Sequence, residues 1–298
     1  MAELNNLAVI ILNYNSYSLT ITAVDNLVKL YSNLKIVIID NASPGDDAKK
    51  LEDEYQCVKN IHVLLNKENK GYAQGNNIGI EYVRRKLPDV DTILIMNPDV
   101  YFDNAEVLTR MNQTLQNDSS LGALTVRTNF NGIVREPNEC AWQFMAKSWM
   151  MFGGTILGKK ILKPGYYNEF SENSNGVAFV DVVQGCFFMI RLECLNKAGD
   201  FDPNTFLYSE ESILAKKLLK SGYVNGVIPS LLICHNHQTK DKQLKSKTNK
   251  RFDMACYYNS RKYYIENYSD TSRLFKTISK FFLDIDHIIK RIFLKFKK

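Results

Sequence analysis

The stretch that decides the fold is Asp91 to Asp103, DTILIMNPDVYFD. Its apolar run, Ile93 to Met96, is too short for a helix and is rich in residues that favour strands. Pro98 cannot donate to a sheet ladder, so we expect the strand to end at Asn97-Pro98-Asp99. Ligands of open α/β sheets bind beyond the carboxyl ends of the strands, which makes Asp99 a candidate ligand of a divalent cation. The same three residue types are also typical of a plain turn.

The segments before this stretch repeat its pattern of a buried strand next to a helix. Apolar runs at 7–12, 35–39 and 61–65 predict strands, and helical patterns lie between them. This alternation favours right-handed βαβ crossovers and a mostly parallel, Rossmann-like sheet flanked by helices, which is an α/β fold. Three strands end in polar residues, and in a parallel sheet such ends meet at one edge. They are Asn13 and Asn15, Asp40 and Asn41, and Asn97 and Asp99.

The second half of the chain contributes a pair of carboxylates, Glu210 and Glu211. Strands are predicted at 122–127, at 180–190 with a kink at Gly185, and at 227–234, and a helix runs from the acidic pair to Lys220. Acidic residues at a helix start are favoured by the helix dipole, and a general base explains them as well. His235 follows the last strand, where both an ordinary histidine and a metal or phosphate ligand remain open.

Residues 128–176 form an irregular segment that contains both tryptophans of the chain, Trp142 and Trp149. Within it, residues 142–152 are rich in aromatic side chains and methionine. Such a segment is typical of a lid or an acceptor loop, but an insertion that packs its own aromatic side chains explains it equally well.

Charge divides the chain into two parts. Of the net charge of +6, residues 1–239 carry −4 and residues 240–298 carry +10. We therefore predict a folded body at 1–239 and a basic extension at 240–298, with a mobile Lys-rich segment at 238–251. The acidic body argues against nucleic-acid binding. No secretory signal or membrane-spanning stretch is expected, and six cysteines without CxxC spacing predict reduced thiols in a cytoplasmic protein.

The extension ends in a pattern typical of an amphipathic helix. From Phe275 onward, apolar residues recur at alternating gaps of three and four, and Lys and Arg flank them. A basic helix of this kind can lie in a membrane interface. A helix packed on the body and a dimeric coiled coil explain the same repeat, so a homodimer remains open.

Several motifs in order carry a resemblance to a known family. The series VIILNYN, IIDNAS, NKGYAQGNN, ILIMNPD, DVVQGCFFMIR, FLYSEE and CHNH, over about residues 7–237, resembles the family 2 glycosyltransferases. Within that family it is most similar to the rhamnosyltransferase-like branch of bacterial capsule and O-antigen synthesis. The resemblance implies a GT-A fold, in which about 1–127 binds a nucleotide sugar and 128–239 carries the acceptor and catalytic part.

The resemblance also implies roles for individual residues of this chain. Glu211 matches the catalytic base and Glu210 flanks it. Asp99 and His235 match the metal side, although Asn97 stands where the family's DxD motif has its first aspartate. The residues that the resemblance assigns to the nucleotide sugar are Asn13, Asn15, Asp40, Asn41, Asn69, Gly71, Gly75, Asn76, Asn97 and Gly185.

The implied activity is that of an inverting, metal-dependent glycosyltransferase that uses Mg²⁺ or Mn²⁺. The favoured reaction moves rhamnose from dTDP-rhamnose to a saccharide acceptor at the inner face of the cell membrane. This acceptor is expected to be linked to a lipid, for example through undecaprenyl diphosphate. A UDP-hexose-dependent transferase of the same family remains open, as does a non-catalytic, membrane-associated subunit that binds a nucleotide sugar. A sugar nucleotidyltransferase is disfavoured, because residues 13–16 lack the Gly-rich basic loop that follows the first strand of such enzymes.

Overall fold

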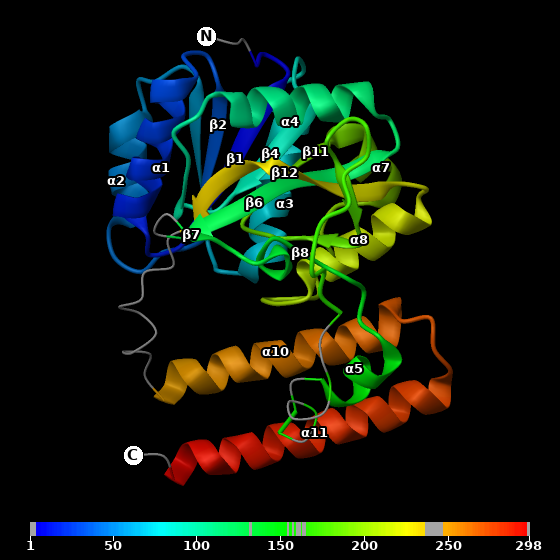
Figure 1. The fold of residues 1–298 in the computed structure, drawn as a ribbon. Coiled ribbons are helices and arrows are strands. Elements are labelled where there is room, and N and C mark those ends of the chain that lie inside the picture. Colours follow the sequence, from blue (N-terminus) through cyan, green and yellow to red (C-terminus); the bar gives the residue numbers. More distant parts are fainter. Residues whose placement is uncertain are drawn as a thin grey trace.

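The computed structural model describes residues 4–130, 133–153, 155–156, 158, 162, 165–235 and 247–296. A large sheet forms the centre of the body, with the strand order β3-β2-β1-β4-β11-β6-β12-β5 (Figure 1). The first four strands pair in parallel and alternate with helices, as predicted. These strands are β1 (Leu7–Asn13), β2 (Lys35–Asp40), β3 (Ile61–Leu65) and β4 (Thr92–Met96), and the helices are α1 (Tyr17–Leu30), α2 (Asp47–Tyr55) and α3 (Gly71–Lys86).

Alternate residues of each central strand enter two hydrophobic cores, one on each face of the sheet. In β1, Val9 and Ile11 join the core under α1 and α4 (Glu106–Asn117), whereas Ala8 and Ile10 join the core on the opposite face. That second core lies under α3, α7 (Leu192–Ala198) and α8 (Glu210–Lys220). Burial on both faces explains the unbroken apolar runs of the sequence. The sequence patterns do not predict α4 and α7.

The second half of the sheet mixes strand directions around β11 (Phe187–Arg191). It runs antiparallel to β4 and β6 (Leu121–Phe130), and β12 (Val224–His235) runs parallel to β6. The strand predicted at 180–190 is three strands, because the chain leaves the main sheet before Gly185 to pair with another segment. The short elements are β5 (Val100–Tyr101), β7 (Ile133–Val134), η1 (Pro137–Glu139), β8 (Ala141–Trp142), β9 (Ala178–Val180) and β10 (Val182–Val183), with β10 paired to β8.

Strand pairing brings the polar strand ends together. The register of β1 and β2 places Asn13 beside Asp40, and the pairing of β5 with β12 places Val100 beside His235. The α/β class and the mostly parallel character of the central sheet are therefore confirmed.

The C-terminal extension consists of two long helices, α10 (Lys247–Tyr268) and α11 (Arg273–Phe296), which lie beneath the body next to α5 (Lys147–Phe152) (Figure 1). A third hydrophobic core joins Met150 of α5, Ile213 of α8, Tyr258 of α10 and Leu283 of α11. Residues 247–251, predicted to be mobile, begin α10 because this helix packs on the body. The remainder of that predicted segment lies outside the described residues. None of the described helices is long and apolar enough to cross a membrane.

Candidate active site

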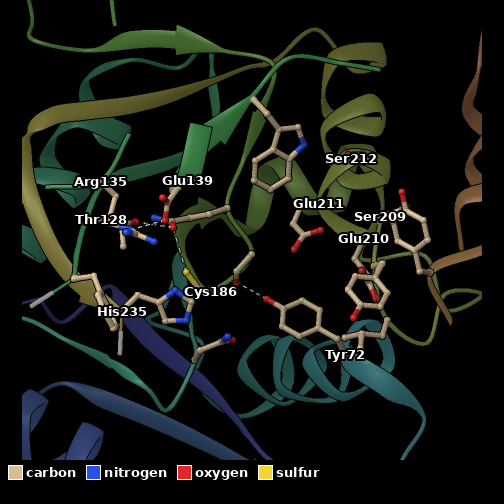
Figure 2. Close-up of a pocket in the computed structure, with 18 residues that line it drawn as sticks. Tyr72, Thr128, Arg135, Glu139, Cys186, Ser209, Glu210, Glu211, Ser212 and His235 are labelled. Atoms are coloured by element: carbon tan, nitrogen blue, oxygen red, sulfur yellow. Dashed lines mark hydrogen bonds and ion pairs between the residues drawn. The ribbon is translucent and has the colours of Figure 1, made fainter. Parts of the chain in front are cut away.

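A cavity of about 690 Å³ opens between the end of β12 and the start of α8 (Figure 2). Five of the predicted site residues line it, namely Asn97, Gly185, Glu210, Glu211 and His235. Figure 2 shows the two glutamates and His235 on opposite sides of this space. The two residues predicted for catalysis and one of those predicted for metal contact, His235, therefore line the same cavity, whereas Asp99 lies outside its lining.

Glu210 and Glu211 begin α8 at different depths. Glu210 is 3% exposed, whereas Glu211 keeps partial exposure. Burial, and then the neighbouring Glu211, raise the pKa of Glu210 to about 8. Burial also raises the pKa of Glu211 above the usual 4.5. The pair thus retains a proton near neutral pH, and the more exposed Glu211 is the carboxylate better placed to accept a proton from a ligand.

The turn before α8 has a strained backbone that α10 holds in place. Tyr208 and Ser209 have φ angles of 77° and 70°, a region that is costly for residues other than glycine. Ser260 Oγ of α10 donates a hydrogen bond of 2.8 Å to the carbonyl of Leu207. The ring of Tyr257, also in α10, meets that of Tyr208 edge-on with centroids 5.9 Å apart. The extension therefore helps to position the paired carboxylates.

Gly185 leaves the space that the Glu211 side chain occupies. A Cβ at position 185 would lie 2.2 Å from Glu211 Oε1. The carbonyl of Gly185 accepts a hydrogen bond of 2.5 Å from Tyr72 Oη, and the Tyr72 amide donates to the carbonyl of Phe206 at 2.9 Å. Burial raises the pKa of Tyr72, which keeps its hydroxyl a donor. Accommodation of Glu211 thus accounts for this glycine, and its contact with a donor sugar stays a prediction.

His235 lines the opposite side of the cavity, and Asp99 contacts it from outside the lining. Asp99 Oδ1 lies 3.3 Å from His235 Nε2. The Asn97 amide donates to the carbonyl of Cys186 at 2.8 Å, which anchors the strand end beside them. Across the described ranges, no three His, Cys, Asp or Glu side chains gather closely enough to hold a metal ion. A cation bound by Asp99 and His235 would therefore need further oxygen ligands from a substrate.

The residues predicted for nucleotide contact on β1 and β2 lie outside the lining of this cavity and bond to one another. Asn13 Nδ2 donates to Asp40 Oδ1 at 2.7 Å, and both side chains are buried. Asp40 Oδ1 also accepts from Ser43 Oγ at 2.6 Å. The amide of exposed Asn15 donates to the same hydroxyl at 2.8 Å. Asn13 and Asp40 thus order the two loops that follow β1 and β2.

Asn41 joins the loop after β2 to the start of α3. Its Nδ2 donates to Asn69 Oδ1 at 2.9 Å and to the carbonyl of Gly71 at 3.2 Å. Its Oδ1 accepts from Asn66 Nδ2 at 2.9 Å. Gly71 has a φ of +89°, and a Cβ there would lie 2.1 Å from the carbonyl oxygen of Phe206. Only glycine fits this position, and it fixes α3 against the loop that leads to the carboxylates.

Gly75 and Asn76 face inward from α3. A Cβ at Gly75 would lie 2.5 Å from Leu12 Cδ1, so close packing of helix on strand accounts for this glycine. Asn76 is buried and its Nδ2 donates to the carbonyl of Tyr72 at 3.0 Å. Contact of either residue with a nucleotide sugar stays a prediction.

The cavity lining also contains residues that the sequence patterns do not predict. Tyr72 and Gln184 lie inside the motifs NKGYAQGNN and DVVQGCFFMIR, so their motif position is a usable signal. Arg135, whose Nε donates to Glu139 Oε2 at 2.6 Å, and Tyr257 lie in none of the quoted motifs. Only the tertiary structure brings these side chains to the site.

Two curated proteins are similar to this chain. Rhamnosyltransferase WbbL of Escherichia coli (strain K12) is 23% identical over 179 residues, which cover 59% of this chain and 65% of that protein. Low-salt glycan biosynthesis hexosyltransferase Agl10 of Haloferax volcanii is 28% identical over 213 residues, which cover 70% of this chain and 60% of that protein. The matches thus span less than two thirds of the length of either relative.

Solved structures with a GT-A fold resemble this one at low sequence identity. Mannosyltransferase PcManGT from Pyrobaculum calidifontis, in complex with GDP-Man and Mn²⁺, has a TM-score of 0.56 at 14% identity, covering 97% of this chain and 73% of that chain. GalNAc-T7 with UDP, GalNAc and Mn²⁺ has a TM-score of 0.60 at 15% identity, and the match covers 94% of this chain and 55% of that chain. The predicted GT-A fold is therefore confirmed. The model of glycosyl transferase family 2 matches residues 8–177, more than half of the chain, so the chain belongs to that family.

Proposed function

We propose that the protein is an inverting, metal-dependent glycosyltransferase that moves a sugar from a nucleotide-sugar donor to a hydroxyl of a saccharide acceptor. The observation that carries this proposal is the carboxylate pair of Glu210 and Glu211, which lies across one cavity from His235, itself 3.3 Å from Asp99. A carboxylate whose pKa burial has raised is a better proton acceptor near neutral pH than an exposed one. The family membership and the similarity to two sugar transferases support the same reaction.

In this proposal Glu211 is the general base and Glu210 keeps its proton. The acceptor hydroxyl attacks the anomeric carbon of the donor sugar while its proton moves to a Glu211 carboxylate oxygen. The bond between the anomeric carbon and the diphosphate oxygen breaks, and the electron pair leaves with the nucleoside diphosphate. Attack from the face opposite the leaving group inverts the configuration. Gly185 and the turn held by α10 keep the Glu211 carboxylate in place.

Asp99 and His235, with Asn97 beside them, are the residues that would hold Mg²⁺ or Mn²⁺. One carboxylate oxygen and one imidazole nitrogen, 3.3 Å apart, suit a cation that takes its remaining ligands from a diphosphate. When bound, the cation would neutralise charge on the leaving diphosphate. The loops ordered by Asn13, Asp40 and Asn41 are proposed to receive the nucleoside. The favoured donor is dTDP-rhamnose, and a UDP-hexose is the alternative.

Membrane contact through α11 is part of the proposal. The helix packs on the body through Ser279, Leu283 and Asp286, and its outer face remains apolar. That face exposes Leu274, Ile278, Phe281, Ile285, Ile288 and Ile292. Exposed cations accompany it, namely Arg273, Arg291 and Lys295. This combination is typical of helices that lie in an anionic membrane interface. This face of α11 therefore supports the proposal that the protein acts at the inner face of the cell membrane on a lipid-linked acceptor.

A nucleotide-sugar panel tests the function. Purified protein is incubated with dTDP-rhamnose, UDP-glucose, UDP-GlcNAc and GDP-mannose, with and without Mn²⁺, and both binding and donor hydrolysis are measured. We expect one donor to be hydrolysed slowly in the presence of Mn²⁺, and Glu211→Gln to stop turnover while it still binds that donor. Binding without turnover in the unmodified protein would instead favour a non-catalytic subunit.

A further inference from the structure

A second cavity, of about 260 Å³, adjoins the active-site cavity on the side of α10 and α5. The two cavities share Trp142, Ser209, Ser212 and Tyr257 in their linings. Ser209 and Ser212 flank the catalytic pair in sequence, so a molecule in the second cavity lies next to Glu210 and Glu211. The volume lies below the range of about 300–1,000 Å³ that is typical of pockets for drug-sized ligands. It therefore suits a single ring rather than a whole nucleotide sugar.

Aromatic side chains dominate this second cavity. They are Trp142, Trp149, Tyr166 and Tyr257, and the polar residues Gln143, Ser209 and Ser212 also line it. Flat aromatic surfaces with a few polar groups match a pyranose ring, whose C–H faces are apolar and whose edge carries hydroxyls. Arg261 is the charged residue of the lining, and both of its terminal nitrogens already donate to backbone carbonyls of Trp149, Met150 and Gly153. The cavity thus offers little to a phosphate group.

The aromatic walls are held by the surrounding structure. Backbone bridges tie Trp142 to Val182 on one side and to Tyr166 on the other. Trp149 belongs to α5, whose next residue, Met150, is buried in the core between α8, α10 and α11. Arg261 Nη1 also donates to Tyr257 Oη at 2.9 Å. A ring that enters this cavity therefore meets surfaces that are largely preformed, which reduces the entropic cost of binding.

We propose that the second cavity is an acceptor subsite that binds the sugar ring next to the one that receives the transfer. The receiving ring then lies in the main cavity beside Glu211, and its neighbour packs between the tryptophans and Tyr257. The acceptor is accordingly a saccharide of at least two rings. This inference rests on the proposed function, because it takes Glu211 to be the base.

The two tryptophans make the subsite directly measurable. They are the only tryptophans in the sequence, and Trp149 lines the second cavity but not the first. In a Trp142→Phe variant, the remaining fluorescence therefore reports on the second cavity alone. We expect disaccharide methyl glycosides of rhamnose, glucose or N-acetylglucosamine to change this fluorescence saturably, with the matching monosaccharides binding about tenfold more weakly.

Two further variants decide the outcome. Tyr166→Ser, made in the Trp142→Phe background, should raise the dissociation constant of the best disaccharide about tenfold. Phe179→Ser removes an exposed aromatic side chain that lines neither cavity and should leave that constant unchanged. No response to any saccharide, or a response to decyl phosphate instead, overturns the subsite. Because donor hydrolysis is measured separately, its failure would count against the proposed function and not against this result.

Discussion

The Oε1 atom of Glu211 occupies the space into which a side chain at Gly185 would project, since a Cβ at position 185 would lie 2.2 Å from that oxygen. The carboxylate proposed as the base and the glycine that follows β10 are therefore matched in shape. The Tyr72 hydroxyl, bonded to the Gly185 carbonyl, fixes the backbone at this point. The position of the base thus depends on three elements that are distant in sequence.

Gly185→Ala tests this match. The added methyl group should displace the Glu211 carboxylate and lower kcat about 100-fold, because displacement of a catalytic group by about 1 Å is enough for such a loss. Binding of the nucleotide-sugar donor, measured by calorimetry, should change little. Gly222→Ala is a control for the substitution itself, since a Cβ there meets nothing within 4 Å, although its φ of +87° costs some stability. Full activity of Gly185→Ala would contradict the assignment of Glu211 as base.

The pH dependence of transfer should follow the glutamate pair. The activity should rise with pH as Glu211 loses its proton, with a midpoint above 4.5, because burial raises its pKa. A second change near pH 8 is expected as Glu210 ionises, and Glu210→Gln should remove it. The measurement is kcat/KM between about pH 4 and pH 9, where Glu211→Gln should be about 10²–10⁴-fold slower. A wild-type midpoint at or below 4.5 contradicts this account.

Ser260→Ala should loosen the turn that presents the carboxylates. The change leaves the half-buried carbonyl of Leu207 without its donor from Ser260 and should cost about 0.5–1.5 kcal/mol of unfolding free energy, with a fall in kcat. Ser279→Ala is a matched control, because its hydroxyl is equally buried but has no hydrogen-bond partner among the described residues. Urea unfolding and initial rates measure both effects. Equal unfolding free energies and equal initial rates in the two variants would show that the contact between α10 and the turn does not position the carboxylates.

Asp99→Asn should raise the Mn²⁺ concentration that gives half-maximal activity by at least about tenfold, because a neutral amide is a weaker ligand than a carboxylate. Asp103→Asn removes an exposed carboxylate four residues away and should leave that concentration unchanged. Activity is titrated with Mn²⁺ after chelation of the enzyme. A normal metal requirement in Asp99→Asn would exclude this residue as a ligand.

Point substitutions on the outer face of α11 test membrane contact better than removal of the helix, since Leu283 is buried against α10. Phe281→Ser with Ile288→Ser should reduce binding to vesicles that contain phosphatidylglycerol about thirtyfold, for a loss of about 2 kcal/mol of apolar burial. Phe179→Ser with Leu219→Ser, on the body, is the control pair. Cosedimentation measures binding. Retained vesicle binding would rule out this face as the membrane contact. If the double variant instead loses a dimer that the unmodified protein forms in the absence of vesicles, the coiled coil is favoured.

Much of the architecture follows from local pattern. The apolar runs of β1, β2 and β4 predict their burial on both faces. The motifs contain Glu211 and His235, which line one cavity, and Asp99, which contacts His235. The helix α4 is not predicted because its sequence, EVLTRMNQTLQN, is mostly polar. Its few apolar residues become part of a hydrophobic core only because they pack against the sheet. Packing therefore supplies the signal that local pattern lacks there.

The sequence by itself determined the fold class and the family and named the residues of the candidate site, because these depend on periodicity and on short motifs. Only the tertiary structure decided what each residue does within it. Gly75 packs α3 on β1, Gly185 makes room for Glu211, and Ser260 from the distant α10 holds the turn before it. In α11 the buried residues are Ser279, Leu283 and Asp286, whereas most residues of the apolar repeat lie beside them and are exposed. Such roles arise from contacts between distant segments, which no local pattern contains.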